Sequence, residues 1–167
     1  MLLADNPFWQ FSTRVYAAPE VAPECIELQD RNGIDVNVLL FAAWLGADRR
    51  TALAAQDIER ITKAIKDWSD NVVTPLRATR RKLKLMSEMT LPAVQALRSR
   101  IAEVELAAEQ LEQAFLYALA ADIGRPMPGN RQHAIEGNVA AVLNWYGVDG
   151  RAAYPKHLHA ACGAAEG

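Results

Sequence analysis

The sequence predicts an all-α fold, in which a long antiparallel helical hairpin packs with short N-terminal helices around a buried central helix. Apolar residues recur at three- and four-residue spacing through most of the 167 positions, as in helices with one buried face. No segment keeps the alternating pattern of a strand. A run over residues 36–45 is apolar on nearly every side, so we expect other helices to surround it.

Composition restricts the class of protein. The chain is 51% hydrophobic and 23% charged with a net charge of −2, which excludes a disordered chain and a generally basic nucleic-acid binder. Cys25 and Cys162 lie far apart without a CxxC motif, which predicts reduced thiols and a cytoplasmic location. The N-terminus lacks the pattern of a signal peptide, and the longest apolar run is too short to span a membrane. We expect no membrane partner, a single helical domain over residues 1–147 and a flexible tail over 148–167.

The N-terminal helices are marked by their ends. Asn6 followed by Pro7 predicts the start of a helix, because the amide caps free N–H groups and the proline has none to leave unpaired. Pro19 is expected to open a second helix. Asn32-Gly33 predicts its end, because both residues tolerate the left-handed conformation of a C-terminal cap.

The apolar run that follows predicts the central helix. Asp35 is placed to cap it, and we expect the helix to stop at Gly46. Phe41 and Trp44 are expected to be buried within it.

Two long patterns predict the hairpin. The first begins near residue 56 and continues past Pro75, which should kink the helix rather than end it. A turn over 87–92 leads to the second, which extends for more than three heptads and whose expected core residues are Val94, Leu97, Ile101, Val104, Ala108, Leu111, Phe115 and Ala118. Asn130 is expected to cap a last helix that closes at Gly147.

The order of four segments resembles a family of small bacterial all-helical proteins known only as a domain of unknown function. The resemblance covers roughly residues 7–120, and its segments are NPFWQFSTRVYAAPEV, CIELQDRNGIDVNVLLFAAWLG, VVTPLRATRRKLK and LRSRIAEVELAAEQLEQAFL. It is most specific in the second of these. The resemblance implies a bacterial, helical single domain and no particular mechanism.

Polar residues gather just before the central helix, and they have two interpretations. Asp30, Arg31, Asp35 and Asn37 could form a pocket at the helix N-terminus, where free N–H groups favour an anion. They could instead cap the helix and fix a tight turn, which we favour because Asp35 would occupy the position that an anionic ligand needs. Asn37 lies within the apolar run, so its amide, if buried, must find partners or cost about 1–3 kcal/mol.

Motifs for metals and catalysis are weak. His157, His159 and Cys162 lie in the expected tail and lack a fourth ligand, and no Glu-x-x-His pair occurs. There is no phosphate-binding glycine loop and no nucleophile elbow. We therefore expect no metal and no cofactor, and we favour a non-enzymatic protein while leaving catalysis open.

Charge is concentrated in the hairpin. Residues 77–100 carry seven bases against the single acid Glu88, and residues 101–122 carry five acids and no base. In an antiparallel hairpin the bases should gather at one tip, with a surface formed by Arg77, Arg80, Arg81, Lys84, Arg98 and Arg100.

Three functional hypotheses follow. The leading one is a binding or adaptor protein whose basic tip contacts an acidic protein or a nucleic-acid backbone. The first alternative is a small-molecule binder or enzyme with a pocket near residues 30–37. The second is self-association through the apolar stripe of the hairpin, giving a homo-oligomer. A plain solvated tip is also compatible with the pattern.

Overall fold

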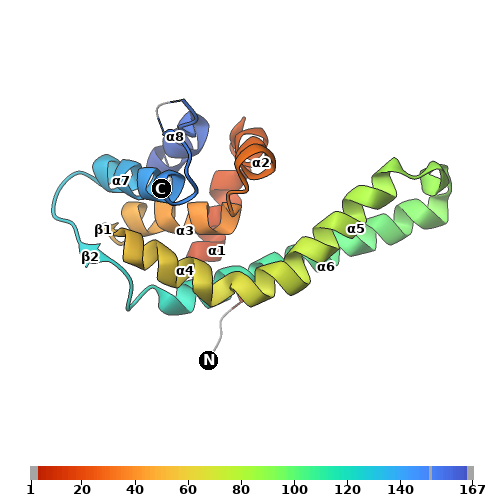
Figure 1. The fold of residues 1–167 in the computed structure, drawn as a ribbon, viewed down its shortest axis with the longest axis horizontal. Coiled ribbons are helices and arrows are strands. Elements are labelled where there is room, and N and C mark those ends of the chain that lie inside the picture. The colour runs from red at the N-terminus through yellow and green to blue at the C-terminus, as the bar shows by residue number, and fades with distance from the viewer. Residues whose placement is uncertain (1–3, 151, 165–167) are drawn as a thin grey trace.

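The protein is all-α, as the sequence predicts (Figure 1). A computed structural model describes residues 4–150 and 152–164. Two very short strands, β1 (Thr51–Ala52) and β2 (Arg125–Pro126), pair antiparallel, and the sequence patterns do not predict them. The α-helices are α1 (Pro7–Tyr16), α2 (Val21–Asn32), α3 (Val36–Ala47), α4 (Ala55–Trp68), α5 (Thr74–Leu85), α6 (Pro92–Leu119), α7 (Arg131–Trp145) and α8 (Lys156–Ala164).

The ends of the first two helices follow their caps. The Asn6 side chain accepts a hydrogen bond from the Trp9 backbone N–H at 3.0 Å, and Pro7 is the first residue of α1. Helix α2 ends where Gly33 takes a φ of +67°, a conformation that glycine adopts without steric cost. Both predicted boundaries are confirmed.

Helix α3 forms the centre of the core. Every residue from 37 to 47 is buried, including Phe41 and Trp44 as expected. Gly46 does not end the helix, in contrast to our expectation. A Cβ atom there would lie 2.7 Å from the backbone of Ala134 in α7, so this glycine lets two helices cross closely.

The expected kink near Pro75 takes the form of a π-helical turn. Residues Ser69–Val73 form this turn between α4 and α5, and Pro75 lies in the first turn of α5. Helices α4 and α5 therefore form one long, interrupted rod that carries the chain away from the core (Figure 1).

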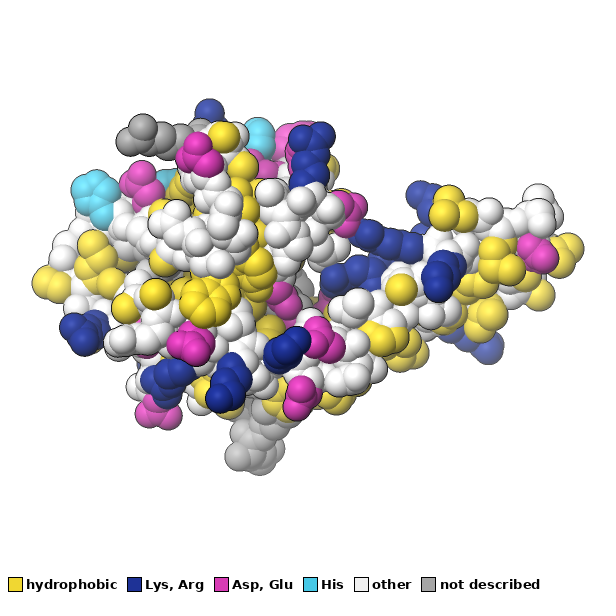
Figure 2. Space-filling view, in the orientation of Figure 1, with side chains coloured by type: hydrophobic (Ala, Val, Ile, Leu, Met, Phe, Trp, Pro, Cys, Tyr) yellow, Lys and Arg dark blue, Asp and Glu magenta, His cyan; other side chains and the backbone are white. Residues whose placement is uncertain are grey.

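The hairpin of α5 and the first half of α6 projects from the body of the molecule, and we call it the arm (Figure 1). Helix α5 has no buried residue. The apolar stripe expected to be buried along α6 is covered only in part, since Leu97 is 50% and Val104 is 54% exposed. The reason is that α5 is the main neighbour that α6 has at that end. Apolar side chains are therefore visible along the arm (Figure 2).

The expectation of a flexible tail over 148–167 needs correction for residues 152–164. Helix α8 packs against α2, α3 and α7, and Leu158 and Cys162 are fully buried in the core. The Glu24 carboxylate accepts hydrogen bonds from the backbone N–H groups of His157 and Leu158, at 3.2 and 2.9 Å, and so fixes the start of α8. Residues 165–167 lie outside the described residues.

None of the helices in the described part of the chain is both long enough and apolar enough to cross a membrane.

Candidate functional site: a cavity between the body and the arm

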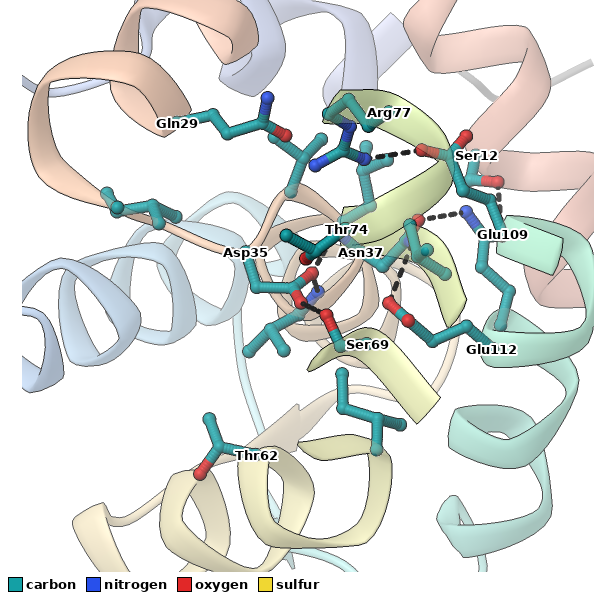
Figure 3. A pocket seen from close by; sticks show the side chains of 18 of the residues that line it. Ser12, Gln29, Asp35, Asn37, Thr62, Ser69, Thr74, Arg77, Glu109 and Glu112 are labelled. Carbon is teal, nitrogen blue, oxygen red and sulfur yellow. Dashed lines mark hydrogen bonds and ion pairs between the residues drawn. The ribbon is translucent and has the colours of Figure 1, made fainter. Parts of the chain in front are cut away.

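A cavity of about 1010 Å³ lies where the arm leaves the body (Figure 2). Its walls come from α1, the second half of α2, the start of α3, α4, the π-helical turn, α5, the middle of α6 and the end of α7. This volume is at the upper end of the range for small-molecule sites. Figure 3 shows polar side chains of α1, α3, the π-helical turn and α6 facing one another.

A chain of hydrogen bonds joins α1, α6 and α3 at the inner wall. The Ser12 hydroxyl donates to the Gln113 carbonyl oxygen at 2.6 Å, and the Gln113 amide donates to Asn37 Oδ1 at 2.8 Å. Asn37 Nδ2 in turn donates to Glu112 Oε1 at 3.0 Å. All four side chains are buried, and we call them the buried network. Asn37 thus has the partners that its position inside an apolar helix requires.

Glu112 ends this network with one oxygen unused. The residue is only 1% exposed, and its Oε2 has no hydrogen-bond partner within the described chain. Burial and then the nearby Asp35 charge raise the pKa of Glu112 to about 8, while the hydrogen bond from Asn37 opposes that rise. The protein therefore leaves a buried carboxyl group with unsatisfied bonding capacity on the wall of the cavity.

Asp35 has two roles at the same place. Its Oδ1 accepts from the backbone N–H groups of Asn37 and Val38, at 2.9 and 3.3 Å, which confirms the predicted cap. Its Oδ2 accepts from the Ser69 hydroxyl in the π-helical turn at 3.3 Å (Figure 3). Burial raises the pKa of Asp35, although the two backbone hydrogen bonds oppose the shift. Asp35 thus caps α3 and lines the cavity.

Arginines of α5 occupy the opposite wall and are ion-paired to α6. Arg77 donates to Glu109 at 2.5 Å and to Glu105 at 3.4 Å, and Arg80 binds Glu105 through two N–H groups. Glu105 is only 5% exposed. Burial works against its ionisation, but these arginines outweigh that effect and lower its pKa. Burial raises the pKa of Glu109 in spite of its bond to Arg77.

These ion pairs show that three arginines of the expected basic tip are bound to acids of the protein. Arg77 and Arg80 lie at the root of the arm, half-buried against the acids of α6, and Arg81 donates to Asp30 Oδ1 at 3.0 Å. The spacing that placed them on one helical face was correct, but that face meets the acidic stretch of α6 and the end of α2. Lys84, Arg98 and Arg100 form no ion pair with any described residue.

The residues predicted for a polar pocket separate into two groups. Asp35 and Asn37 meet at the cavity, and Asp30 lines its edge through the pair with Arg81. Arg31 instead pairs with Glu27 on the exposed face of α2 and does not line the cavity.

Sequence reasoning missed the contribution of α6 to this site. Glu105, Glu109 and Glu112 recur at intervals of four and three residues, so they share one helical face. That regularity was available in the sequence as a signal. The apolar stripe of the same helix predicts a different buried face, and it therefore hides the signal of the three glutamates. Ser12 and Ser69 carry no such signal, since each is an isolated hydroxyl.

The arrangement suits acid–base and hydrogen-bonding chemistry. A carboxyl with a pKa of about 8 beside a second acid can hold or release a proton near neutral pH. No group of three or more His, Cys, Asp or Glu side chains in the described residues could hold a metal ion. His159 instead contacts Tyr154 and Gln132, at 3.0 and 2.7 Å, away from this cavity.

Comparison with known proteins gives a family and no assigned chemistry. No curated protein and no solved structure matches the chain. The sequence profile of one family matches residues 7–116, a range that contains Asp35, Arg77 and Glu112. Because this match covers well over half of the 167 residues, the chain belongs to the family described as "Protein of unknown function (DUF2390)".

Proposed function

We propose that this protein binds a small organic molecule in the cavity between the body and the arm. One observation carries the proposal: Glu112 lines a cavity of about 1010 Å³ and has a buried carboxylate oxygen without a hydrogen-bond partner among the described residues. A folded protein avoids such a group because it costs about 1–3 kcal/mol. A ligand that bonds to this oxygen recovers part of that cost.

The wall of the cavity supports the same function. The buried network holds Glu112 in place from α3 and α6, so the oxygen has a fixed position before a ligand arrives. Rigid polar groups in a concave cavity are typical of small-molecule sites.

A screen of ligand-induced thermal stabilisation tests the proposal. A library of metabolites is measured against the wild type and against Thr74→Trp, which adds bulk at a residue of α5 that lines the cavity. The control is Thr79→Trp, an exposed position on the same helix outside the cavity. We expect some compounds to stabilise the wild type and the control but not Thr74→Trp. No stabilisation in the wild type, or equal stabilisation in all three proteins, would contradict the proposal.

The exposed side chains of the arm favour a second candidate function, the binding of an acidic protein. Leu85 is 86% exposed, and Met86 and Leu91 near it are also exposed. Lys84 and Arg98 belong to the same projecting hairpin and form no ion pair with any described residue. A surface that is both apolar and basic suits a protein partner better than a phosphate backbone, which would leave the apolar side chains unused.

Charge reversal on the arm tests this second function. A protein captured from a native extract is purified, and its Kd is measured against the wild type and the triple reversal of Lys84, Arg98 and Arg100 to Glu. The control reverses three exposed bases of the body, which are Arg14, Arg49 and Arg125. We expect the arm reversal alone to weaken binding, with a strong salt dependence in the wild type. Equal Kd values in all proteins would contradict this function. Self-association that disappears in Leu85→Ser would assign the arm to a homo-oligomer instead.

A further inference from the structure

The hydrogen bonds of the buried network all run in one direction. Ser12 donates to Gln113, Gln113 donates to Asn37, and Asn37 donates to Glu112. The chain therefore ends at a carboxylate, which in its ionised form only accepts hydrogen bonds. Burial raises the pKa of Glu112, so the carboxyl of the free protein can also hold a proton on Oε2. A cation bound beside it favours the ionised form, and the group that completes the network is then a donor.

The charged side chains that line the cavity also favour a ligand group that is a donor, and one that carries a positive charge. The arginines on the opposite wall are committed to acids of the protein: Arg77 to Glu109 and Glu105, and Arg81 to Asp30. Neither Asp35 nor Glu112 forms an ion pair with any described residue. The inner wall thus presents two acids that form no ion pair within the described chain, although burial raises the pKa of both and the charge of Arg77 lies close enough to oppose that rise. A positive ligand group there is attracted by both carboxyl groups.

The rest of the lining is suited to an apolar body. Trp9, Tyr16, Leu106 and Trp145 line the same cavity, and the last three are partly exposed, so they lie toward its opening. Aromatic side chains give both apolar contact and a favourable surface for a nearby cation.

We propose that the cavity binds a small molecule in which a protonated primary amine or a guanidinium group is joined to an apolar body, with the cation donating to Glu112 Oε2. This inference rests on the proposed function and names the ligand class of the same site. A quaternary ammonium fits less well, because it has no N–H to donate. A metal ion fits less well too, since no cluster of three or more ligating side chains occurs in the described residues.

A matched series of probes tests the ligand class on the wild-type protein. Phenethylamine, phenethyl alcohol, hydrocinnamate and phenethyltrimethylammonium share an aromatic ring and differ in the head group. Affinities are measured by isothermal titration calorimetry. We expect phenethylamine to bind at least about tenfold more tightly than the other three, as a charge-assisted hydrogen bond implies. Equal or tighter binding of the alcohol, the acid or the quaternary ammonium would overturn the inference.

Variants of α6 locate the contact. Glu112→Gln keeps the shape of the side chain and its bond with Asn37 while removing the charge, and we expect it to bind phenethylamine about tenfold more weakly. Glu103→Gln is the control, because Glu103 is exposed on the same helix and does not line the cavity. An unchanged affinity in Glu112→Gln, or an equal loss in both variants, would also overturn the inference.

The two proposals fail in different ways. If library compounds bind the wild type and Thr74→Trp blocks them, but the amine has no advantage in the matched series, the cavity is a binding site for another ligand class. If Thr74→Trp blocks nothing, the cavity itself is not the binding site.

Discussion

The body around α3 and the projecting arm are stabilised by different forces. In the body, residues 37–47 are buried without interruption, and Trp44 packs against the rings of Phe8, Phe41 and Tyr117 at centroid distances of 5.5 to 5.8 Å. In the arm, α5 buries no residue, and its root is fixed to α6 by ion pairs of arginine with glutamate. Apolar burial is independent of ionisation, whereas the root of the arm depends on charge. The cavity lies between the body, which apolar burial stabilises, and the root of the arm, which ion pairs stabilise.

The largest expected effect comes from the body. Trp44→Ala removes a side chain that is 2% exposed, and we expect it to lower the free energy of unfolding by about 3–5 kcal/mol, measured by urea denaturation. Trp145→Ala is the control, since that ring is 43% exposed and should cost much less. Near-wild-type stability in Trp44→Ala would mean that α3 is not the centre of the core.

The next effect comes from the root of the arm. Glu105→Ala leaves Arg80 without its carboxylate and Arg77 with only Glu109, and we expect a loss of about 1.5–3 kcal/mol. Compared with the wild type, amide hydrogen exchange should become faster in α5 and stay unchanged in α3, because the variant loses an ion pair that holds the arm and no contact within the core. Glu103→Ala, at an exposed position of the same helix, should change neither quantity. Unchanged exchange in α5 would show that the ion pairs do not hold the arm.

The third effect depends on pH and concerns Glu112. Its folded-state pKa of about 8 exceeds the ordinary value of 4.5, so the folded state binds this proton more tightly than the unfolded state. The stability that this proton contributes is fully present at pH values below the ordinary pKa of 4.5, and it is lost as the pH rises toward the folded-state pKa of about 8. Between these values the free energy of unfolding falls by at most about 1.4 kcal/mol per pH unit. Glu112→Gln should therefore show a flatter dependence of unfolding free energy between about pH 5 and pH 8. Denaturation across this range measures it, and parallel curves for the two proteins would contradict the assignment.

The smallest effect is expected on the surface of α2. Arg31 pairs with Glu27 while 77% of its side chain is exposed, and such pairs contribute less than about 0.5 kcal/mol. Arg31→Ala should change the midpoint of thermal unfolding very little. A loss as large as that of Glu105→Ala would remove the distinction between enclosed and exposed pairs.

The fold was predictable where a local signal decides it. Asn6, Asp35 and Gly33 mark helix ends through bonds with their own neighbours, and a helix without a polar face has to be central. Gly46 shows the limit, because the helix continues through it for a reason that lies in α7. Helix α8 likewise forms because Glu24 of α2 accepts a hydrogen bond at its start and the core has space for Leu158. Neither contact can be seen in the local sequence of α8.

The candidate site was half predictable. Asp35 and Asn37 are polar residues beside an apolar run, which marks them as candidates in the sequence, and both line the cavity. Their partner Glu112 lies 75 residues away from Asn37 in the sequence. The spacing of the basic residues of α5 predicts a charged face, but only the packing of α5 on α6 shows that Arg77 and Arg80 are paired. Long-range pairing is the information that one sequence does not carry.

One measurement tests the central claim, that the cavity wall contains a buried carboxyl group without a full set of partners. The pKa of the Glu112 side chain can be read from the carboxyl carbon shift in an NMR titration of the isotope-labelled protein. The structure predicts a value of about 8, lowered in Asp35→Asn because the neighbouring negative charge is removed. A Glu112 carboxyl that titrates near the ordinary 4.5 in the wild type would be a solvated or paired group, and it would contradict the site proposed here.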